Sequence, residues 1–316
     1  MCMSRYLITG GAGFIGSNLV HTLQNSVPNE SRAPETIVFD ALTYAGNLQN
    51  LADLRYPEKN QFIHADVRDI KSVDAAVLNC DAIFHLAAES HVDRSITNPS
   101  VFLETNVIGT LNVLEAAQKY SKRVVVVSTD EVYGSLDEGF ATEYFSLNPS
   151  SPYSASKASA DLLANSYVKT FGTDVIITRC TNNYGPRQYP EKLIPQTINK
   201  ILNNQKIPVY GDGSNIRDWI HVDDHCAGLV LAMELGTKGS IYNFGNKDKV
   251  SNLEIVRKLL AILNNSDVLI DFVKDRLGHD YRYAIDASKA KLELGWNPTK
   301  SLESDLANVV DWYKSL

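Results

Sequence analysis

Thr9-Gly-Gly-Ala-Gly-Phe-Ile-Gly16 separates a short apolar run, residues 6–9, from an amphipathic segment that begins at Phe14. Gly10 suits a tight turn, Gly13 lets the backbone approach a pyrophosphate, and Gly16 lets a helix pack closely on a strand. The N-terminus of the following helix offers free N–H groups and a positive dipole end to phosphate. The stretch therefore predicts a dinucleotide-binding turn between the first strand and the first helix.

Two carboxylates follow where a dinucleotide needs hydrogen-bond acceptors. Asp40 ends the second expected strand, 24 residues after Gly16, and can accept from the ribose hydroxyls of adenosine. Because a carboxylate repels a 2′-phosphate, NAD is favoured over NADP. Asp66 follows the third expected strand and can accept from the adenine amino group, although an acidic loop residue is as often only solvated.

Short β-branched and aromatic runs alternate with amphipathic segments over the first 180 residues. Strands that are apolar almost throughout, with helices between them, are typical of a parallel sheet covered on both faces. The pattern predicts an α/β fold with a Rossmann-type, doubly wound parallel sheet. The expected strands are 6–9, 36–40, 62–65, 82–86, 124–128 and 175–179, and the clearest helices are 14–24, 106–119 and 153–171.

The sequence changes in character after residue 180, where prolines and glycines become frequent and the strand-like runs become short. We expect an NAD-binding Rossmann domain at 1–180 and a smaller, mixed substrate-binding domain at 181–316. Parts of 217–245 have the pattern of a helix followed by a strand and are expected to rejoin the first domain. The second domain is therefore expected to be discontinuous.

The composition excludes several classes of partner. Lys plus Arg total 30 and Asp plus Glu total 37, which gives a formal net charge of −7. Nucleic acid and anionic membranes require concentrated positive charge, so neither is an expected partner. The four cysteines form no Cys-x-x-Cys pair, the first residues show no secretory signal, and no run reaches the ~20 apolar residues of a spanning helix. We expect a cytoplasmic protein.

Tyr153 and Lys157 form a Tyr-x-x-x-Lys pair at the start of the helix expected after the fifth strand. The i, i+4 spacing places both side chains on one helix face. The motif is weak by itself and gains weight from its place beside a dinucleotide site. A nearby ammonium and a nicotinamide cation would lower the pKa of the tyrosine and make it a base.

Thr129, Asp130 and Glu131 leave the fifth strand at its carboxyl end, the edge where open α/β sheets bind ligands. Two adjacent carboxylates are not needed there for folding. An acidic pair is more often a solvated turn or a charge at a helix N-terminus. Beside a candidate tyrosine base, we favour a catalytic acid pair.

His221-Val-Asp-Asp-His225 places two histidines at i, i+4 with carboxylates between them, which is also a possible arrangement of metal ligands. The alternative is that Asp223 or Asp224 caps the helix running to Leu235 while the histidines pack or face solvent. No further ligand cluster supports a metal. We favour the structural interpretation and expect no metal.

Three motifs carry a family resemblance: Thr-Gly-Gly-x-Gly-x-x-Gly from residue 9, Ser-Thr-Asp-Glu-Val-Tyr-Gly from residue 128 and Tyr-Ser-x-Ser-Lys from residue 153. Together they resemble the extended short-chain dehydrogenase/reductases, and among these the dTDP-glucose 4,6-dehydratase family. Further similar segments at 85–93, 179–186, 191–195, 217–219 and 278–283 extend the resemblance over nearly the whole chain. The Thr-Asp-Glu triplet discriminates, because sugar epimerases of this fold lack the acid pair.

The resemblance implies roles at the matching positions. Tyr153 would take the C4 hydroxyl proton, with Lys157 tuning it and Thr129 bonded to the C4 oxygen. Asp130 would protonate the departing C6 hydroxyl, and Glu131 would remove the C5 proton. Besides Tyr153 and Lys157, the NAD contacts would be Gly10, Gly13, Phe14, Ile15, Gly16, Asp40, Leu42, Thr43, Asp66, Val67, Leu86, Ala87, Ala88, Thr105 and Asn182. Besides Thr129, the nucleotide-sugar contacts would be Glu89, Ser90, Asn183, Glu191, Lys192, Arg217, Asn252, Arg276 and His279.

One position departs from the family pattern. Leu277 stands where the family commonly has proline between the arginine and the glycine of an Arg-Pro-Gly-His-Asp motif. This loosens the backbone and leaves the placement of Arg276 open.

The implied activity is that of an NAD-dependent lyase that converts dTDP-glucose to dTDP-4-keto-6-deoxy-glucose and water. A UDP-glucose 4,6-dehydratase would share the same catalytic residues, whereas a UDP-hexose 4-epimerase would lack the acid pair. A non-catalytic NAD-sensing protein would have lost at least one of Thr129, Tyr153 and Lys157. The apolar residues of helices 105–120 and 153–170 suit the symmetric four-helix contact of a homodimer, unless all of them face the sheet.

Overall fold

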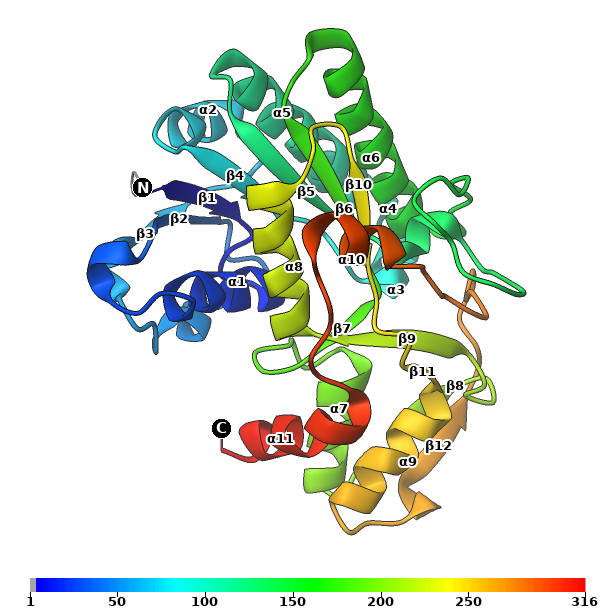
Figure 1. The fold of residues 1–316 in the computed structure, drawn as a ribbon. Coiled ribbons are helices and arrows are strands. Elements are labelled where there is room, and N and C mark those ends of the chain that lie inside the picture. Colours follow the sequence, from blue (N-terminus) through cyan, green and yellow to red (C-terminus); the bar gives the residue numbers. More distant parts are fainter. Residues whose placement is uncertain (1–3, 316) are drawn as a thin grey trace.

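The large sheet of the protein lies above a smaller second layer (Figure 1) in the computed structural model, which describes residues 4–315. Its seven strands run in the order β10-β6-β5-β4-β1-β2-β3, and every neighbouring pair is parallel. The chain therefore winds outward from β1 in both directions, which confirms the predicted Rossmann-type, doubly wound sheet. The strands are β1 (Arg5–Thr9), β2 (Glu35–Asp40), β3 (Asn60–His64), β4 (Ala82–His85), β5 (Arg123–Thr129), β6 (Val175–Cys180) and β10 (Ile241–Phe244).

Helices cover both faces of this sheet and bury a separate apolar core on each face. Successive residues of a strand point to opposite faces, so Ile8 packs with Leu19 and Leu229 while Leu7 packs with Val73 and Val113. The first core includes α1 (Phe14–Asn25), α8 (Val222–Leu235) and α10 (Ser288–Leu294); the second includes α2 (Ile70–Leu78), α5 (Gly109–Lys119) and α6 (Pro152–Phe171).

The second layer has its own core, to which Ile198, Ile255 and Val310 contribute. A three-stranded sheet orders β11 (Lys249–Ser251), β9 (Ile216–His221) and β7 (Asn182–Tyr184), and β8 (Ile207–Tyr210) pairs with β12 (Ile270–Val273). Its helices are α7 (Leu193–Leu202), α9 (Asn252–Ile262) and α11 (Leu302–Lys314). The stretch 217–245 supplies most of β9 to this layer and then returns to the large sheet as α8 and β10.

Short elements follow the carboxyl ends of β4 and β5. They are α3 (Val92–Thr97), α4 (Pro99–Phe102), the π-helical segment η4 (Leu103–Ile108) and the 3₁₀ turn η5 (Asp130–Tyr133). Four further 3₁₀ turns are η1 (Glu30–Arg32), η2 (Leu48–Leu51), η3 (Pro57–Lys59) and η6 (Asp267–Leu269). Within residues 4–315, no helix is both long enough and apolar enough to cross a bilayer.

Candidate active site

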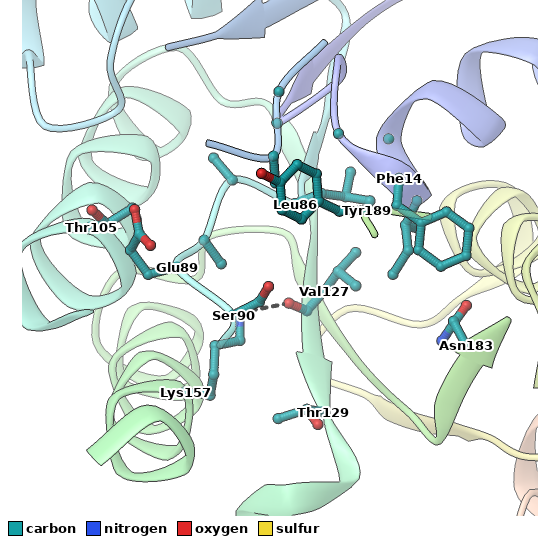
Figure 2. A pocket seen from close by; sticks show the side chains of 18 of the residues that line it. Phe14, Leu86, Glu89, Ser90, Thr105, Val127, Thr129, Lys157, Asn183 and Tyr189 are labelled. Carbon is teal, nitrogen blue, oxygen red and sulfur yellow. Dashed lines mark hydrogen bonds between the residues drawn. The ribbon is translucent and has the colours of Figure 1, made fainter. Parts of the chain in front are cut away.

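A cavity of about 350 Å³ opens at the carboxyl ends of the parallel strands, where doubly wound sheets bind their ligands. All of the expected catalytic residues line it, as do all of the expected NAD contacts except Leu42. In Figure 2, Lys157 and Thr129 lie toward one end of the cavity, and Phe14, Leu86 and Tyr189 toward the other. The expected substrate contacts that line it are Glu89, Ser90, Thr129, Asn183, Glu191 and Lys192.

The glycine turn leaves no room for side chains. Gly10 has φ +69°, and a Cβ there would come within 2.8 Å of the Ala87 backbone nitrogen. A Cβ at Gly16 would overlap the Gly10 carbonyl oxygen. The turn therefore brings bare backbone to the cavity and lets α1 begin directly behind it.

Asp40 is held by two backbone N–H groups, from Ala12 to Oδ2 at 2.9 Å and from Leu42 to Oδ1 at 2.8 Å. Burial raises the pKa of this carboxyl, against the lowering effect of the two donors. Leu42 thus acts through its backbone, and its side chain packs against the apolar core rather than lining the cavity. Asp66 is bonded to the Arg68 guanidinium at 2.7 Å, and this bond lowers the pKa of the Asp66 carboxyl.

Tyr153 and Lys157 lie on the first turns of α6, which begins with a capping box between Ser151 and Ser154. The Lys157 Nζ donates to the Val127 carbonyl oxygen at 2.8 Å, as Figure 2 shows. Burial lowers the pKa of Lys157. Burial, reinforced by the nearby Glu131, raises the pKa of Tyr153 well above the ordinary value, so the expected lowering depends on the nicotinamide cation as well as on the ammonium.

Asp130 and Glu131 meet different environments in η5. Asp130 is 3% exposed, Thr129 Oγ1 donates to its Oδ1 at 3.3 Å, and its Oδ2 has no hydrogen-bond partner among residues 4–315. Burial, followed by the charges of Glu131 and Asp218, raises the pKa of Asp130 well above its ordinary range. Burial also raises the pKa of Glu131, but the positive charges of Arg276, Arg217 and Lys192 oppose that effect.

Burial raises the pKa of both carboxyls, but only that of Asp130 lies well above its ordinary value, so Asp130 holds a proton more strongly than Glu131 does. A pair whose environments separate its pKa values can supply one acid and one base to the same substrate.

The loop after β4 is fixed by Asn106, which the sequence analysis did not single out. Asn106 lies in the π-helical η4; its Oδ1 accepts from the Glu89 N–H at 2.8 Å, and its Nδ2 donates to the Glu89 carbonyl at 3.0 Å. Isolated π segments of this kind are frequent at functional sites. Lys192 Nζ donates to the Ser90 carbonyl at 2.9 Å, so this loop is tied to the second layer.

The side chain of Asn183 is already fully engaged. Its Oδ1 lies 2.9 Å from His225 Nδ1, and its Nδ2 donates to the Thr181 carbonyl at 2.9 Å. His221 is the N-cap of α8, because its Nδ1 accepts from the Asp223 N–H at 3.1 Å. The expected cap by Asp223 or Asp224 was therefore wrong, since the ring nitrogen takes the position that we gave to a carboxylate.

Four expected substrate residues lie outside the lining of the cavity. Arg217 is 3% exposed, lies over the ring of Tyr283 and donates to the Asp280 carbonyl at 2.9 Å. Asn252 begins α9, and His279 is bonded to Asp275 at 2.6 Å. Arg276 Nη1 lies 3.9 Å from Asp93.

Sequence reasoning also missed His85. It is 2% exposed, with Nδ1 2.8 Å from Thr9 Oγ1 and Nε2 2.9 Å from Thr110 Oγ1. This bridge joins the strand before the glycine turn to α5. Its only sequence signal is a polar residue at the end of an apolar strand.

Comparisons with known proteins agree with this site. The family described as GDP-mannose 4,6 dehydratase matches residues 7–309. The chain is 46% identical over 310 residues to the dTDP-glucose 4,6-dehydratase of Streptomyces antibioticus, covering 98% of this chain and 92% of the relative. The chain therefore belongs to the extended short-chain dehydrogenase/reductases and, within that class, to the dTDP-glucose 4,6-dehydratase family.

Two solved structures with different activities have backbones similar to that of this chain. The structure of DesIV, a dTDP-glucose 4,6-dehydratase from Streptomyces venezuelae with NAD and TYD bound, is 48% identical with a TM-score of 0.94, and the match covers 98% of this chain and 97% of that one. A UDP-glucose 4-epimerase from Thermotoga maritima with UDP-glucose is 29% identical with a TM-score of 0.90, covering 98% and 99%. The backbone is thus common to both activities, and side chains must distinguish them.

Proposed function

We propose that this protein converts dTDP-glucose to dTDP-4-keto-6-deoxy-glucose and water, with NAD as its cofactor. The observation that carries the proposal is the acid pair Asp130 and Glu131, which lines the same cavity as Tyr153 and Lys157. An epimerase has no need of an acid and a base beside the tyrosine, whereas an elimination of water needs both.

The residues present fit NAD. Gly10, Gly13 and Gly16 line the cavity without side chains, since a Cβ at Gly10 or Gly16 would clash with neighbouring backbone, and both oxygens of Asp40 accept from backbone donors beside the cavity. A fixed carboxylate there suits the two ribose hydroxyls of adenosine and repels a 2′-phosphate. When bound, NAD supplies a hydride acceptor and, later in the same turnover, a hydride donor.

In the proposed mechanism, Tyr153 removes the C4 hydroxyl proton while Thr129 hydrogen-bonds the same oxygen. The raised pKa of Tyr153 makes the phenolate costly, so the base depends on positive charge close to the ring. Lys157 lies one helical turn away and is held by the Val127 carbonyl. We propose that it orients the nicotinamide ribose and stabilises the phenolate as it forms.

Glu131 then removes the C5 proton, which a neighbouring C4 ketone makes acidic. Asp130 gives its proton to the departing C6 hydroxyl, in keeping with its raised pKa and its unpartnered Oδ2. We propose that Lys192, Arg217 and Arg276 hold the pyrophosphate; all three already act on the charge of Glu131. Asn183, Asn252 and His279 stay proposed substrate contacts, and Asn183 would first have to release a partner.

We further propose a cytoplasmic homodimer. Leu103, Ile108, Leu162 and Phe171, on η4 and α6, are between 48% and 62% exposed. These residues do not face the sheet, and a four-helix contact between two copies would cover them.

The test is mass spectrometry of the product after separate incubations with dTDP-glucose and UDP-glucose. We expect a product lighter by one water molecule from the dTDP sugar. The same loss from UDP-glucose alone would move the proposal to a UDP-glucose dehydratase, and an unchanged mass from both donors would refute dehydration.

A further inference from the structure

Arg94, on α3, contacts both Tyr44 and Glu191, which lie far apart in the sequence. Its guanidinium carbon lies 3.7 Å from the ring centre of Tyr44, and its Nη2 donates to Glu191 Oε2 at 2.9 Å. Tyr44 belongs to the loop after β2 that starts at Asp40, and Glu191 precedes α7 in the second layer. Tyr44 also packs edge-on against Tyr189, with ring centres 5.6 Å apart.

The carboxylate of Glu191 is held through one oxygen only. Its side chain is 16% exposed and lines the cavity, and its Oε1 is buried with no hydrogen-bond partner in the described part of the chain. A buried acceptor of this kind is costly until a donor reaches it. A pyrophosphate has only acceptors and negative charge, so it cannot supply this donor. The hexose hydroxyls of a nucleotide-sugar can, and comparison with dTDP separates them from the donors of the nucleoside.

His91 is a second neighbour of the Glu191 carboxylate. Its Nδ1 accepts the backbone N–H of Arg94 at 3.4 Å, which leaves the ring proton on Nε2. Nε2 lies 3.9 Å from the same Oε2 that Arg94 holds. Both neighbours therefore face one oxygen of Glu191 and leave the other, buried oxygen without a partner among residues 4–315.

The adjacent residue, Asp93, contacts two further residues of the second layer. It accepts from the Tyr210 hydroxyl at 3.2 Å and lies 3.9 Å from Arg276. Asp93 and Arg94 thus contact separate parts of the second layer. These contacts fix the position of α3 and therefore the position of Arg94 relative to Glu191.

We infer that Arg94 is a positioning residue, which holds Glu191 Oε2 so that Oε1 accepts a hydroxyl of the hexose in the bound nucleotide-sugar. This inference rests on the proposed function. Tyr44 supports the guanidinium, because this planar cation can lie on an aromatic face and still direct N–H donors at a carboxylate.

The test compares the affinities for dTDP-glucose and dTDP by calorimetry, in NAD-loaded protein. A Tyr153→Phe background prevents consumption of the sugar. Arg94→Met should weaken dTDP-glucose binding about tenfold or more, the effect of losing a charged hydrogen bond, and leave dTDP binding unchanged. Arg94→Lys should restore part of the loss. The matched control is Arg257→Met, because Arg257 is paired with Asp267 at the same 2.9 Å, and Asp267, unlike Glu191, does not line the cavity.

A double-mutant cycle tests whether Arg94 acts through Glu191. Arg94→Met combined with Glu191→Gln should bind dTDP-glucose no worse than the weaker single variant. Additive losses, an equal loss of dTDP affinity, or unchanged dTDP-glucose affinity in Arg94→Met would each overturn the inference while the proposed function stands. If the parent protein binds dTDP but not dTDP-glucose, and the wild type releases no dehydrated product, both are overturned.

Discussion

Replacing Asp130 by asparagine should stabilise the folded protein at neutral pH while it slows dehydration. The carboxyl is 3% exposed, its Oδ2 has no partner within residues 4–315, and Glu131 and Asp218 add negative charge nearby. Burial is the largest cause of its raised pKa. The folded protein therefore holds a proton that the unfolded chain releases as the pH rises.

The sign of the pH dependence follows from that proton. The folded state binds more protons than the unfolded state between the two pKa values, so the free energy of unfolding falls as pH rises through this window. It stays lower above the window, by about 1.4 kcal/mol for each unit of difference. Asparagine does not ionise, so the variant escapes this loss. Because the pKa of Asp130 is raised well above its ordinary range, we expect the variant to be more stable than wild type above this window.

Guanidinium denaturation at a fixed NAD concentration measures this effect at pH 4 and pH 7.5. The Asp130→Asn variant should exceed wild type clearly at the higher pH and much less at the lower pH. Asp271→Asn, on the exposed edge of β12, is the control and should change little. Turnover of Asp130→Asn should fall by roughly 10²–10⁴, the usual contribution of a general acid. A variant that is less stable than wild type at pH 7.5, or equally shifted at both pH values, would refute the reasoning.

Three other variants or conditions test separate parts of the account. Tyr153→Phe should abolish the whole sequence without accumulation of reduced nicotinamide, because oxidation at C4 comes first; reduced cofactor in that variant would contradict its role. Protein stripped of cofactor should be reactivated by NAD and poorly by NADP, because Asp40 opposes a 2′-phosphate, and equal reactivation would refute this. Leu162→Asp should halve the mass measured by light scattering, since Leu162 is 62% exposed; a monomeric wild type would exclude the dimer.

The large sheet could be predicted because its signals are local. Each buried strand is a short apolar run, and the glycine turn and the acid pair follow strand ends directly. All expected catalytic residues therefore meet in one cavity. Because the strands are parallel, their carboxyl ends lie at one edge of the sheet, and the residues that follow those ends form the site.

What could not be predicted depends on tertiary packing. The engagement of Asn183 by His225 joins residues 42 positions apart, and nothing in either segment indicates it. Burial is the largest cause of the raised pKa of Tyr153 in the protein alone, and periodicity does not reveal that burial. Likewise α10 comes from the far end of the chain and packs in the same core as α1 and α8.

One measurement tests the central claim, that Asp130 and Glu131 carry out an elimination. Wild-type protein is incubated with dTDP-glucose in heavy water, and the product is analysed by mass spectrometry and proton magnetic resonance. The account predicts loss of one water molecule and gain of one deuterium at C5, because the proton that Glu131 removes is replaced from exchanged solvent. Glu131→Gln should lose both changes together. A product with unchanged mass, or a dehydrated product that keeps the original hydrogen at C5, would contradict the account.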